Sequence, residues 1–228
     1  MSLIVTNIDG VLADSERRWR TAFREVYGKA RKIDMAKAMR GLSPLLTEEQ
    51  EMQFLSVFMS DKFMHLDRPI PHASRVLRKA VKKGYSVVYL TKRVDSMRAA
   101  TLQWLGKHRF PLDGPNVHLF MKEGVNSSDS EFLKSRISEI MEMGDVAFGV
   151  ANSLDSVVVY SECGIKPVIL ETGRDPAKQL NVSLENIVKV SSWKEVGKML
   201  GLGEAEKQAA IQVKTAGAAV AEYKNENP

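Results

Sequence analysis

Several polar and charged residues of this chain stand directly after apolar, β-branched runs. Asn7 and Asp9 end the first run, Thr91 and Lys92 follow a second, and Asp155 comes shortly after a later one. Because ligands bind beyond the carboxyl ends of the strands in an open parallel sheet, we expect these side chains to gather at one edge. A hydroxyl, cations and carboxylates at one edge suit a phosphate and a hard divalent cation.

Apolar runs with the length of strands alternate with segments of helical character along most of the chain. Parallel neighbouring strands need crossover connections, so this alternation predicts an α/β fold with a doubly wound parallel sheet. Gly164 stands where one of the helices should end, as a glycine commonly does. The expected strands are 3–8, 85–90, 117–120, 146–150, 167–171 and 187–190, and the expected helices are 72–83, 96–108, 131–143, 155–163 and 193–200.

Residues 15–66 interrupt this alternation, because they are helical in character and lie between the first expected strand and the second. Ser15 precedes a predicted helix from Glu16 to about Lys32, and Thr47-Glu48-Glu49-Gln50 has the pattern of a capping box that opens another. We therefore predict a small helical cap inserted after the first strand. The predicted domains are a core of residues 1–14 and 67–202, the cap at 15–66 and an alanine-rich helical tail at 203–228.

The polar positions also carry a family resemblance. The segment Ile4–Ser15 resembles the first motif of the haloacid-dehalogenase (HAD) superfamily of phosphohydrolases, an apolar strand followed by Asp-x-Asp-Gly-Val/Thr-Leu. Tyr89-Leu90-Thr91 resembles its second motif, Lys134 its third-motif lysine, and Gly149 to Asp155 its fourth. The motifs follow one another in the family's order on matching elements, so the resemblance implies the HAD-like fold.

The resemblance implies a role for each position. In this family an aspartate attacks phosphorus, and a second aspartate two residues later acts as acid and then as base. A magnesium ion neutralises the phosphoryl charge. Carried over to this chain, Asp9 is the acid/base and lends its carbonyl to the metal, and Asp155 is a metal ligand. The implied phosphate ligands are Thr91 and Lys134. Lys92 is a further candidate, and Lys122 or Lys92 could supply the charge in place of Lys134.

Two departures from the family pattern bear on catalysis. Asn7 occupies the position of the nucleophile, and an uncharged amide does not readily form an acyl-phosphate. The fourth motif usually has an aspartate where this chain has Val150 or Ala151, and neither side chain can bind a metal. Magnesium prefers carboxylates and water, so we expect its binding to be weak or absent. Loss of a covalent nucleophile commonly lowers the rate by several orders of magnitude.

Three explanations for Asn7 stay open at the level of sequence. The protein is a natural non-catalytic relative that keeps the phosphate site, or water attacks the phosphorus directly, or the asparagine is a laboratory substitution. The apolar Val150 and Ala151 argue against the last explanation, because one engineered change would leave the fourth motif whole.

Composition limits the remaining classes of function. Hydrophobic residues make up 44% of the 228 residues and charged residues 27%, which is the balance of a soluble globular protein. The apolar runs are too short to span a bilayer and no signal-peptide pattern is visible, so we expect a cytoplasmic protein without a membrane partner. Cys163 is the only cysteine, which excludes an internal disulfide.

The net charge of +5 comes largely from basic clusters within residues 17–32 and 75–83. They suit either anionic ligands or a solvated helix face, and no RNA-binding aromatic motif or zinc-finger spacing accompanies them, so nucleic acid is not the expected partner. The tail at 203–228 either packs on the core or mediates self-association into a homo-oligomer.

These patterns lead to one main hypothesis and one alternative. The main hypothesis is a capped phosphatase-like domain that binds a phosphorylated small molecule, with magnesium-dependent phosphomonoester hydrolysis weak or lost because of Asn7. The alternative is a non-catalytic interaction protein that uses its basic cap and its C-terminal helix to hold a partner.

Overall fold

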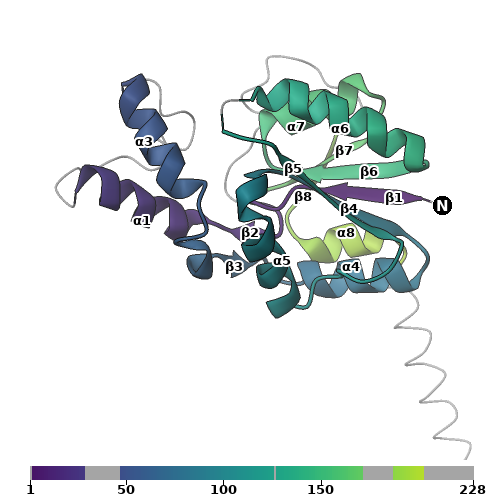
Figure 1. Ribbon diagram of the computed structural model, residues 1–228. Coiled ribbons are helices and arrows are strands. Elements are labelled where there is room, and N and C mark those ends of the chain that lie inside the picture. The colour runs from purple at the N-terminus through teal and green to yellow at the C-terminus, as the bar shows by residue number, and fades with distance from the viewer. Residues whose placement is uncertain (1, 29–46, 126, 172–186, 203–228) are drawn as a thin grey trace, which may run out of the picture.

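The computed structural model describes residues 2–28, 47–125, 127–171 and 187–202. Its centre is a sheet of six strands in the order β5-β4-β1-β6-β7-β8, and all neighbouring strands in it are parallel (Figure 1). The doubly wound parallel sheet predicted from the sequence is therefore confirmed. Its strands are β1 (Leu3–Thr6), β4 (Ser86–Val94), β5 (Val117–Lys122), β6 (Val146–Ala151), β7 (Pro167–Leu170) and β8 (Val188–Val190).

Helices cover both faces of this sheet. In Figure 1, α6 and α7 lie above it, and α4, α5 and α8 lie below it. The Ser128 side chain accepts a hydrogen bond from the Glu131 backbone amide and caps α6, which begins two residues earlier than the sequence predicted. The helices are α4 (Ala73–Lys82), α5 (Arg98–Lys107, after the 3-10 turn Asp95–Met97), α6 (Asp129–Met143), α7 (Leu154–Glu162) and α8 (Trp193–Met199).

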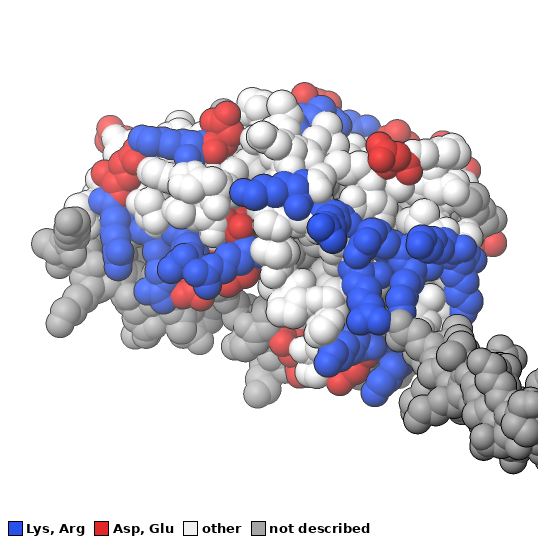
Figure 2. Space-filling view, turned by 90° about the horizontal axis from the view of Figure 1, so that it is seen from below, with Lys and Arg blue, Asp and Glu red and all other residues white. Residues whose placement is uncertain are grey.

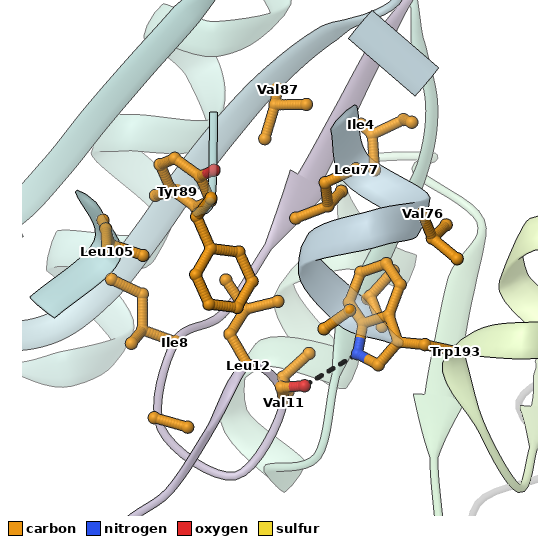
Figure 3. Close-up of a cluster of buried hydrophobic side chains, with 14 of the residues drawn as sticks. Ile4, Ile8, Val11, Leu12, Val76, Leu77, Val87, Tyr89, Leu105 and Trp193 are labelled. Carbon is orange, nitrogen blue, oxygen red and sulfur yellow. Dashed lines mark hydrogen bonds between the residues drawn. The ribbon is translucent and has the colours of Figure 1, made fainter. Parts of the chain in front are cut away.

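The alternation of side chains along the strands creates a separate apolar core on each face. On β1, Ile4 joins the core under α4, α5 and α8, whereas Leu3 and Val5 join the core under α6 and α7. In the first of these cores, the buried Trp193 donates a hydrogen bond from its indole to the Val11 carbonyl at 2.8 Å (Figure 3). This bond ties α8 to the loop that follows β1.

Strand β4 differs from its prediction in a way that affects the site. It was expected to end at Leu90, but it continues to Val94. Its pairing with β5 shifts register between Thr91 and Val94, which leaves Lys92 and Arg93 in an irregular stretch of the strand. Such a bulge changes the direction of the side chains. The polar residues that were expected to follow the strand are therefore its last residues.

Among the described residues of the segment 15–66, two α-helices lie side by side. These are α1 (Glu16–Tyr27) and α3 (Glu48–Phe58), and they share an apolar cluster built on Trp19, Phe23 and Phe54. The predicted capping box is confirmed: the Thr47 and Gln50 side chains each bond the other's backbone. A short antiparallel ribbon of β2 (Ala13–Asp14) and β3 (Arg68–Pro69) lies at the two ends of this inserted segment, and the 3-10 turn Met64–Leu66 leads into β3.

The order of the strands reverses at β1, because the chain builds one side of the sheet through β4 and β5 and the other through β6, β7 and β8. The carboxyl ends of β1, β4 and β6 therefore meet at the switch point, where open α/β sheets bind ligands. This edge faces the side of the sheet that carries α1 and α3 (Figure 1). The predicted tail at 203–228 lies outside the described residues. Within the described residues, no helix has the length and apolar character needed to cross a bilayer.

Candidate functional site

Asn7 directly follows β1 and is a buried residue with 7% of its surface exposed. Its side-chain amide donates a 2.9 Å hydrogen bond to the Leu90 carbonyl of β4, and its backbone amide donates to the Val150 carbonyl of β6. The residue therefore joins three strands at the switch point. Its Nδ2 atom is committed to the backbone, so the side chain in the nucleophile position serves as a structural link.

The other end of the Asn7 side chain lies near Tyr160. The phenol is fully buried on α7, and its ring packs so closely on β6 that a Cβ at Gly149 would lie 2.5 Å from it. Burial raises the pKa of Tyr160, and Asn7 opposes part of this rise. Neither Asn7 Oδ1 nor the Tyr160 hydroxyl makes a hydrogen bond of good geometry with another group, although each is near enough to influence the other. The Asn7 oxygen is thus enclosed by the core.

Asp9 belongs to a cluster of opposite charges in which the arginines are buried, while its own side chain is 31% exposed. Its Oδ1 accepts hydrogen bonds from Arg18 at 2.6 Å and Arg93 at 2.8 Å, and its Oδ2 accepts one from Arg93 Nε at 2.8 Å. Burial alone would raise the pKa of this carboxyl, but the two guanidinium groups hold it below its usual range. An acid that stays ionised and is bonded at both oxygens is poorly suited to move a proton.

Asp67 completes this cluster, which we call the ionic cluster: Asp9, Arg18, Asp67 and Arg93. The Asp67 carboxylate lies 3.1 Å from Arg18 Nε and 2.8 Å from Arg93 Nη2, and its side chain is fully buried. Burial raises the pKa of Asp67 to about 6, against the opposing effect of Arg18. The cluster joins α1, β4, the loop after β1 and the segment before β3, so it fixes the inserted helices to the sheet.

A second group of charges lies where β4, β5, α6 and α7 approach one another. Lys92 Nζ lies 2.8 Å from Asp129 Oδ2 and 3.1 Å from Asp155 Oδ2. The other Asp129 oxygen accepts a 2.5 Å bond from Lys122, which also donates to the Ser127 carbonyl. Burial works against the charge on Lys92, but Asp129 and Asp155 outweigh it and raise the pKa of the ammonium. We call this group, Lys92, Lys122, Asp129 and Asp155, the lysine cluster.

The structure brings most of the predicted site residues together. Contacts between Asn7 and Leu90, Asp9 and Arg93, and Lys92 and Asp155 place them at the carboxyl ends of β1, β4 and β6. Thr91 is buried in β4, where its hydroxyl accepts a hydrogen bond from the Arg93 amide at 3.2 Å.

Lys134 differs from the other predicted phosphate ligands. Its ammonium pairs with Glu162 of α7 at 2.9 Å, and both side chains are about half exposed. Lys122, the alternative, is 5% exposed and bonds Asp129 beside Lys92. The lysine that accompanies Lys92 is therefore Lys122, because it lies at the end of β5 whereas Lys134 lies on the outer surface of α6.

The carboxylates of this edge do not fit a magnesium ion. Asp9 is bonded to two arginines and Asp155 to Lys92, while Val150 and Ala151 are buried apolar residues at the fourth-motif positions. Magnesium needs oxygen donors with lone pairs turned toward it, and here cationic side chains hold them. Within the described residues, no three His, Cys, Asp or Glu side chains are grouped as a metal site.

Sequence reasoning missed the partners that neutralise these acids. Arg18 is next to Trp19 on the buried face of α1 and stacks over the Phe58 ring at 4.4 Å, so a basic residue on an apolar helix face was its only signal. Asp67 belongs to none of the sequence motifs described above, and Asp129 precedes the start expected for its helix. The sequence also did not show that Gly10 lies against Asn152. Gly10 has a φ of 75°, and a Cβ at this position would clash with the Asn152 side chain.

Comparisons with known proteins agree with this architecture. A hydrolase of the haloacid dehalogenase-like family from Streptococcus pneumoniae superposes with a TM-score of 0.66 at 13% identity, over 87% of this chain and 98% of that one. A mutant of CbbY from Rhodobacter sphaeroides, with an aspartate replaced by asparagine and xylulose-1,5-bisphosphate bound, gives a TM-score of 0.54 at 15% identity, over 86% of this chain and 96% of that one. At such identities the likeness establishes the HAD-like phosphatase fold.

The curated relatives match a smaller part of this chain than the solved structures do. Membrane-associated phosphatidylinositol transfer protein 2 of Mus musculus is 31% identical over 103 residues, which are 42% of this chain and 7% of that protein. The Homo sapiens protein of the same name is 32% identical over 103 residues, with the same coverage. The chain thus spans only a small part of the length of these relatives.

The family model described as the LNS2 domain of PITM 1-3 matches residues 53–169. The matched region includes Lys92, Arg93, Lys122 and Asp155 of the two clusters. Asn7, Asp9 and Arg18 precede it. Since the matched region is just over half of the 228 residues, the chain belongs to the LNS2 domain family and has the HAD-like phosphatase fold.

Proposed function

We propose that this domain binds a phosphate-bearing ligand at the switch-point edge and hydrolyses phosphomonoesters weakly or not at all. The observation that supports the proposal most directly is how the side chains at the nucleophile and acid/base positions are hydrogen-bonded. Asn7 donates its amide to the Leu90 carbonyl, and Asp9 accepts hydrogen bonds from two arginines. The nucleophile and the acid/base of the family are thus both used to hold the fold together.

The loss of catalysis follows from the combination of these two changes. Removing a covalent nucleophile commonly lowers turnover by several orders of magnitude, about 1.4 kcal/mol of barrier for each factor of ten. Direct attack by water would still need a base, and the pKa of Asp9 is held low by Arg93 and Arg18 against the effect of burial. A weakly basic carboxylate without a free oxygen does not activate water well.

The lysine cluster supports binding of a phosphate. Lys92 and Lys122 come from neighbouring strands and meet at Asp129, and the Lys92 side chain is 30% exposed. A phosphate dianion that displaces Asp129 or Asp155 from Lys92 exchanges one charge-assisted bond for another of similar strength. The ammonium groups supply the positive charge that a metal would otherwise provide, so we propose that binding does not require magnesium.

The known proteins are compatible with a phosphate-bearing ligand. The CbbY mutant holds a sugar bisphosphate on the same fold, and the curated relatives are named for phosphatidylinositol, a phospholipid. The ligand class we propose is therefore a phosphate group carried by a soluble small molecule or by a lipid headgroup. The experiment below separates these two sources.

Isothermal titration of the full chain with inorganic phosphate and with inositol 1-phosphate, each with magnesium or with EDTA, tests the proposal. We expect binding that is unchanged by EDTA and weakened about tenfold or more by Lys92→Gln or Lys122→Gln, since a charge-assisted bond contributes about 1.5–3 kcal/mol. Lys134→Gln is the matched control and should bind normally. Binding only to vesicles that contain phosphatidylinositol would assign the site to a lipid.

Two results would overturn the proposal. The first is the absence of binding to every probe by a correctly folded protein. The second is brisk magnesium-dependent hydrolysis of a phosphomonoester by protein whose mass confirms Asn7.

The alternative of a basic cap that holds a partner receives less support. Arg18 is buried in the ionic cluster, and Arg20 pairs with Glu16 on α1. Some of the other basic residues predicted for that surface lie outside the described residues, and so does the tail predicted at 203–228.

A further inference from the structure

The chain between β5 and the first turn of α6 places exposed serines beside the lysine cluster. They are Ser127, Ser128 and Ser130. The Lys122 ammonium holds the residues on both sides of Ser128, because it donates to the Ser127 carbonyl at 2.6 Å and to Asp129 Oδ1 at 2.5 Å. Ser128 is therefore attached on each side to a lysine that is only 5% exposed.

Asp129 indicates what kind of group the two lysines select. Its second carboxylate oxygen lies 2.8 Å from the Lys92 ammonium. Burial works against the charge on Asp129, but hydrogen bonds from Lys122 and Lys92 outweigh it and hold the pKa of the carboxyl below its usual range. The start of α6 thus delivers an anion to a pair of lysines. A phosphate carries more charge and three acceptor oxygens, so it is a stronger ligand for the same pair.

The Ser128 hydroxyl is accessible to modification. The residue is exposed, and its oxygen accepts one long hydrogen bond of 3.3 Å from the Glu131 backbone amide at the start of α6. A phosphate on this oxygen stays at the amino end of the helix, where backbone amides favour negative charge. Modification therefore does not remove the cap of α6.

The residues after Ser128 have the charge pattern that some protein kinases select. Asp129 follows it directly, and Glu131 stands three residues further on. Neither Ser127 nor Ser130 has an acidic residue at the third position after it. Kinases discriminate between substrates by such charge patterns, so a kinase with a basic pocket for acidic residues favours Ser128.

Basic side chains elsewhere on the molecule surround a serine of the opposite kind. Figure 2 shows Lys and Arg side chains gathered on the side of the sheet that carries α4 and α8. Ser74, at the start of α4, is followed by Arg75 and Arg78, and its hydroxyl donates to the Arg109 carbonyl at 2.6 Å. An acid-selective kinase therefore distinguishes Ser128 from Ser74.

We propose that Ser128 is a phosphorylation site whose phosphate occupies the lysine cluster and closes it to other phosphate-bearing ligands. The terminal phosphoryl group of a nucleoside triphosphate passes to Ser128 Oγ as its bond to the neighbouring phosphate breaks. The nucleoside diphosphate leaves, and the hydroxyl proton goes to a base of the kinase. The inference rests on the proposed function, because it gives that phosphate site a regulator.

The covalent link makes the phosphate of Ser128 a strong competitor. A group tethered close to its site has an effective concentration in the millimolar range or above. An effective concentration of about 10 mM against a dissociation constant of about 1 mM for free phosphate lowers the apparent affinity about tenfold. The phosphoserine takes the place of Asp129 between the lysines.

Titration calorimetry of the full chain with phosphoserine installed at position 128 tests the proposal. We expect its affinity for inorganic phosphate to fall about tenfold or more relative to the unmodified protein. The matched control carries phosphoserine in place of Ser135, an exposed residue about two turns further along α6, and should bind phosphate within a few-fold of the unmodified protein. Melting temperatures verify that all proteins are folded.

Phosphorus NMR of the same proteins gives a second readout that needs no free ligand. The second pKa of phosphoserine is about 6, and two adjacent ammonium groups should lower it to about 5 or below at position 128 but not at position 135. Lys92→Gln should raise it again, whereas Lys134→Gln should leave it unchanged. If the unmodified protein binds no phosphate while this lysine-dependent shift is present, the proposed function fails and the place of the phosphoserine stands.

Treatment with ATP and an acid-selective protein kinase, followed by peptide mass spectrometry, tests the choice of serine. We expect modification mainly at Ser128, and slower modification in Glu131→Gln. Any of three results contradicts the proposal: modification of Ser127 or Ser130 instead, undiminished phosphate binding by protein that carries phosphoserine at 128, or equal phosphoserine pKa values at 128 and 135.

Discussion

The substitution Asn7→Asp restores the side chain that the phosphatase mechanism requires, yet we expect it to destabilise the protein. The Nδ2 atom that donates to the Leu90 carbonyl at 2.9 Å would become an oxygen, and the residue has only 7% of its surface exposed. Two buried oxygens would then face each other without a proton between them. Leaving a buried carbonyl without its donor costs about 1–3 kcal/mol, and a buried carboxylate charge adds to this.

The cost of Asn7→Asp should depend on pH. Burial raises the pKa of the introduced acid, because it disfavours the charged form. Below the pKa of an aspartate in the unfolded chain the acid is protonated in both states, and its hydroxyl can donate to the Leu90 carbonyl as the amide did. As the pH rises through the higher pKa of the folded state, this stabilisation is lost at about 1.36 kcal/mol for each unit of pKa difference.

Urea denaturation of wild type, Asn7→Asp and Asn7→Ala between about pH 4 and pH 8 measures this effect. The difference from wild type should grow with pH for Asn7→Asp and stay constant for Asn7→Ala, which loses the same hydrogen bond without gaining an acid. Hydrolysis of p-nitrophenyl phosphate should remain at background, since Arg18 and Arg93 still hold Asp9. A variant as stable as wild type at pH 8 that hydrolyses the substrate with magnesium would refute the reasoning.

Three further predictions concern neighbouring residues. Burial raises the pKa of Asp67 to about 6, so this residue stabilises the fold most at low pH. Between about pH 4 and pH 7, wild type should lose up to about 3 kcal/mol of unfolding free energy relative to Asp67→Asn. A difference in urea denaturation that does not change with pH would contradict this. Gly10→Ala should cost clearly more in thermal denaturation than Gly28→Ala, because both glycines have a φ of 75° but only Gly10 has Asn152 within contact of a Cβ; equal costs would show that Asn152 moves freely. Tyr160→Phe should change the unfolding free energy by less than about 0.5 kcal/mol, since its hydroxyl makes no hydrogen bond of good geometry, and a loss above about 1 kcal/mol would indicate a bond to Asn7.

The fold could be predicted from the sequence because local patterns determine it. The strand and helix runs alternate, and each buries one apolar side, so their order alone predicts a parallel sheet and the edge where polar residues collect. The position at which β4 ends could not be predicted in the same way. Its continuation beyond Leu90 depends on pairing with β5 through a shift of register, which is a tertiary interaction.

The members of the site were predictable only in part. The position of Lys134 matched a family motif, but a helix residue can face either the site or the solvent, and its pairing with Glu162 depends on the packing of α6 on α7. Lys122 ends a strand, so its position is fixed by the sheet. Arg18 and Asp67 are far from the motifs in sequence, and their contact with Asp9 depends on how the inserted helices return to the core.

The two clusters together support the proposal that this edge has polar residues but no phosphatase reaction. The ionic cluster pairs two carboxylates with two arginines, and the lysine cluster pairs two carboxylates with two lysines. A magnesium-dependent phosphatase needs an excess of carboxylate at this place to attract the metal and a charged nucleophile to attack phosphorus. Here each negative charge has a protein cation beside it, so the driving force for metal binding is small. Under the proposed function, phosphate replaces a carboxylate at the partly exposed groups. Lys92 is the favoured residue for this exchange, because its two carboxylate partners are themselves 38% and 51% exposed.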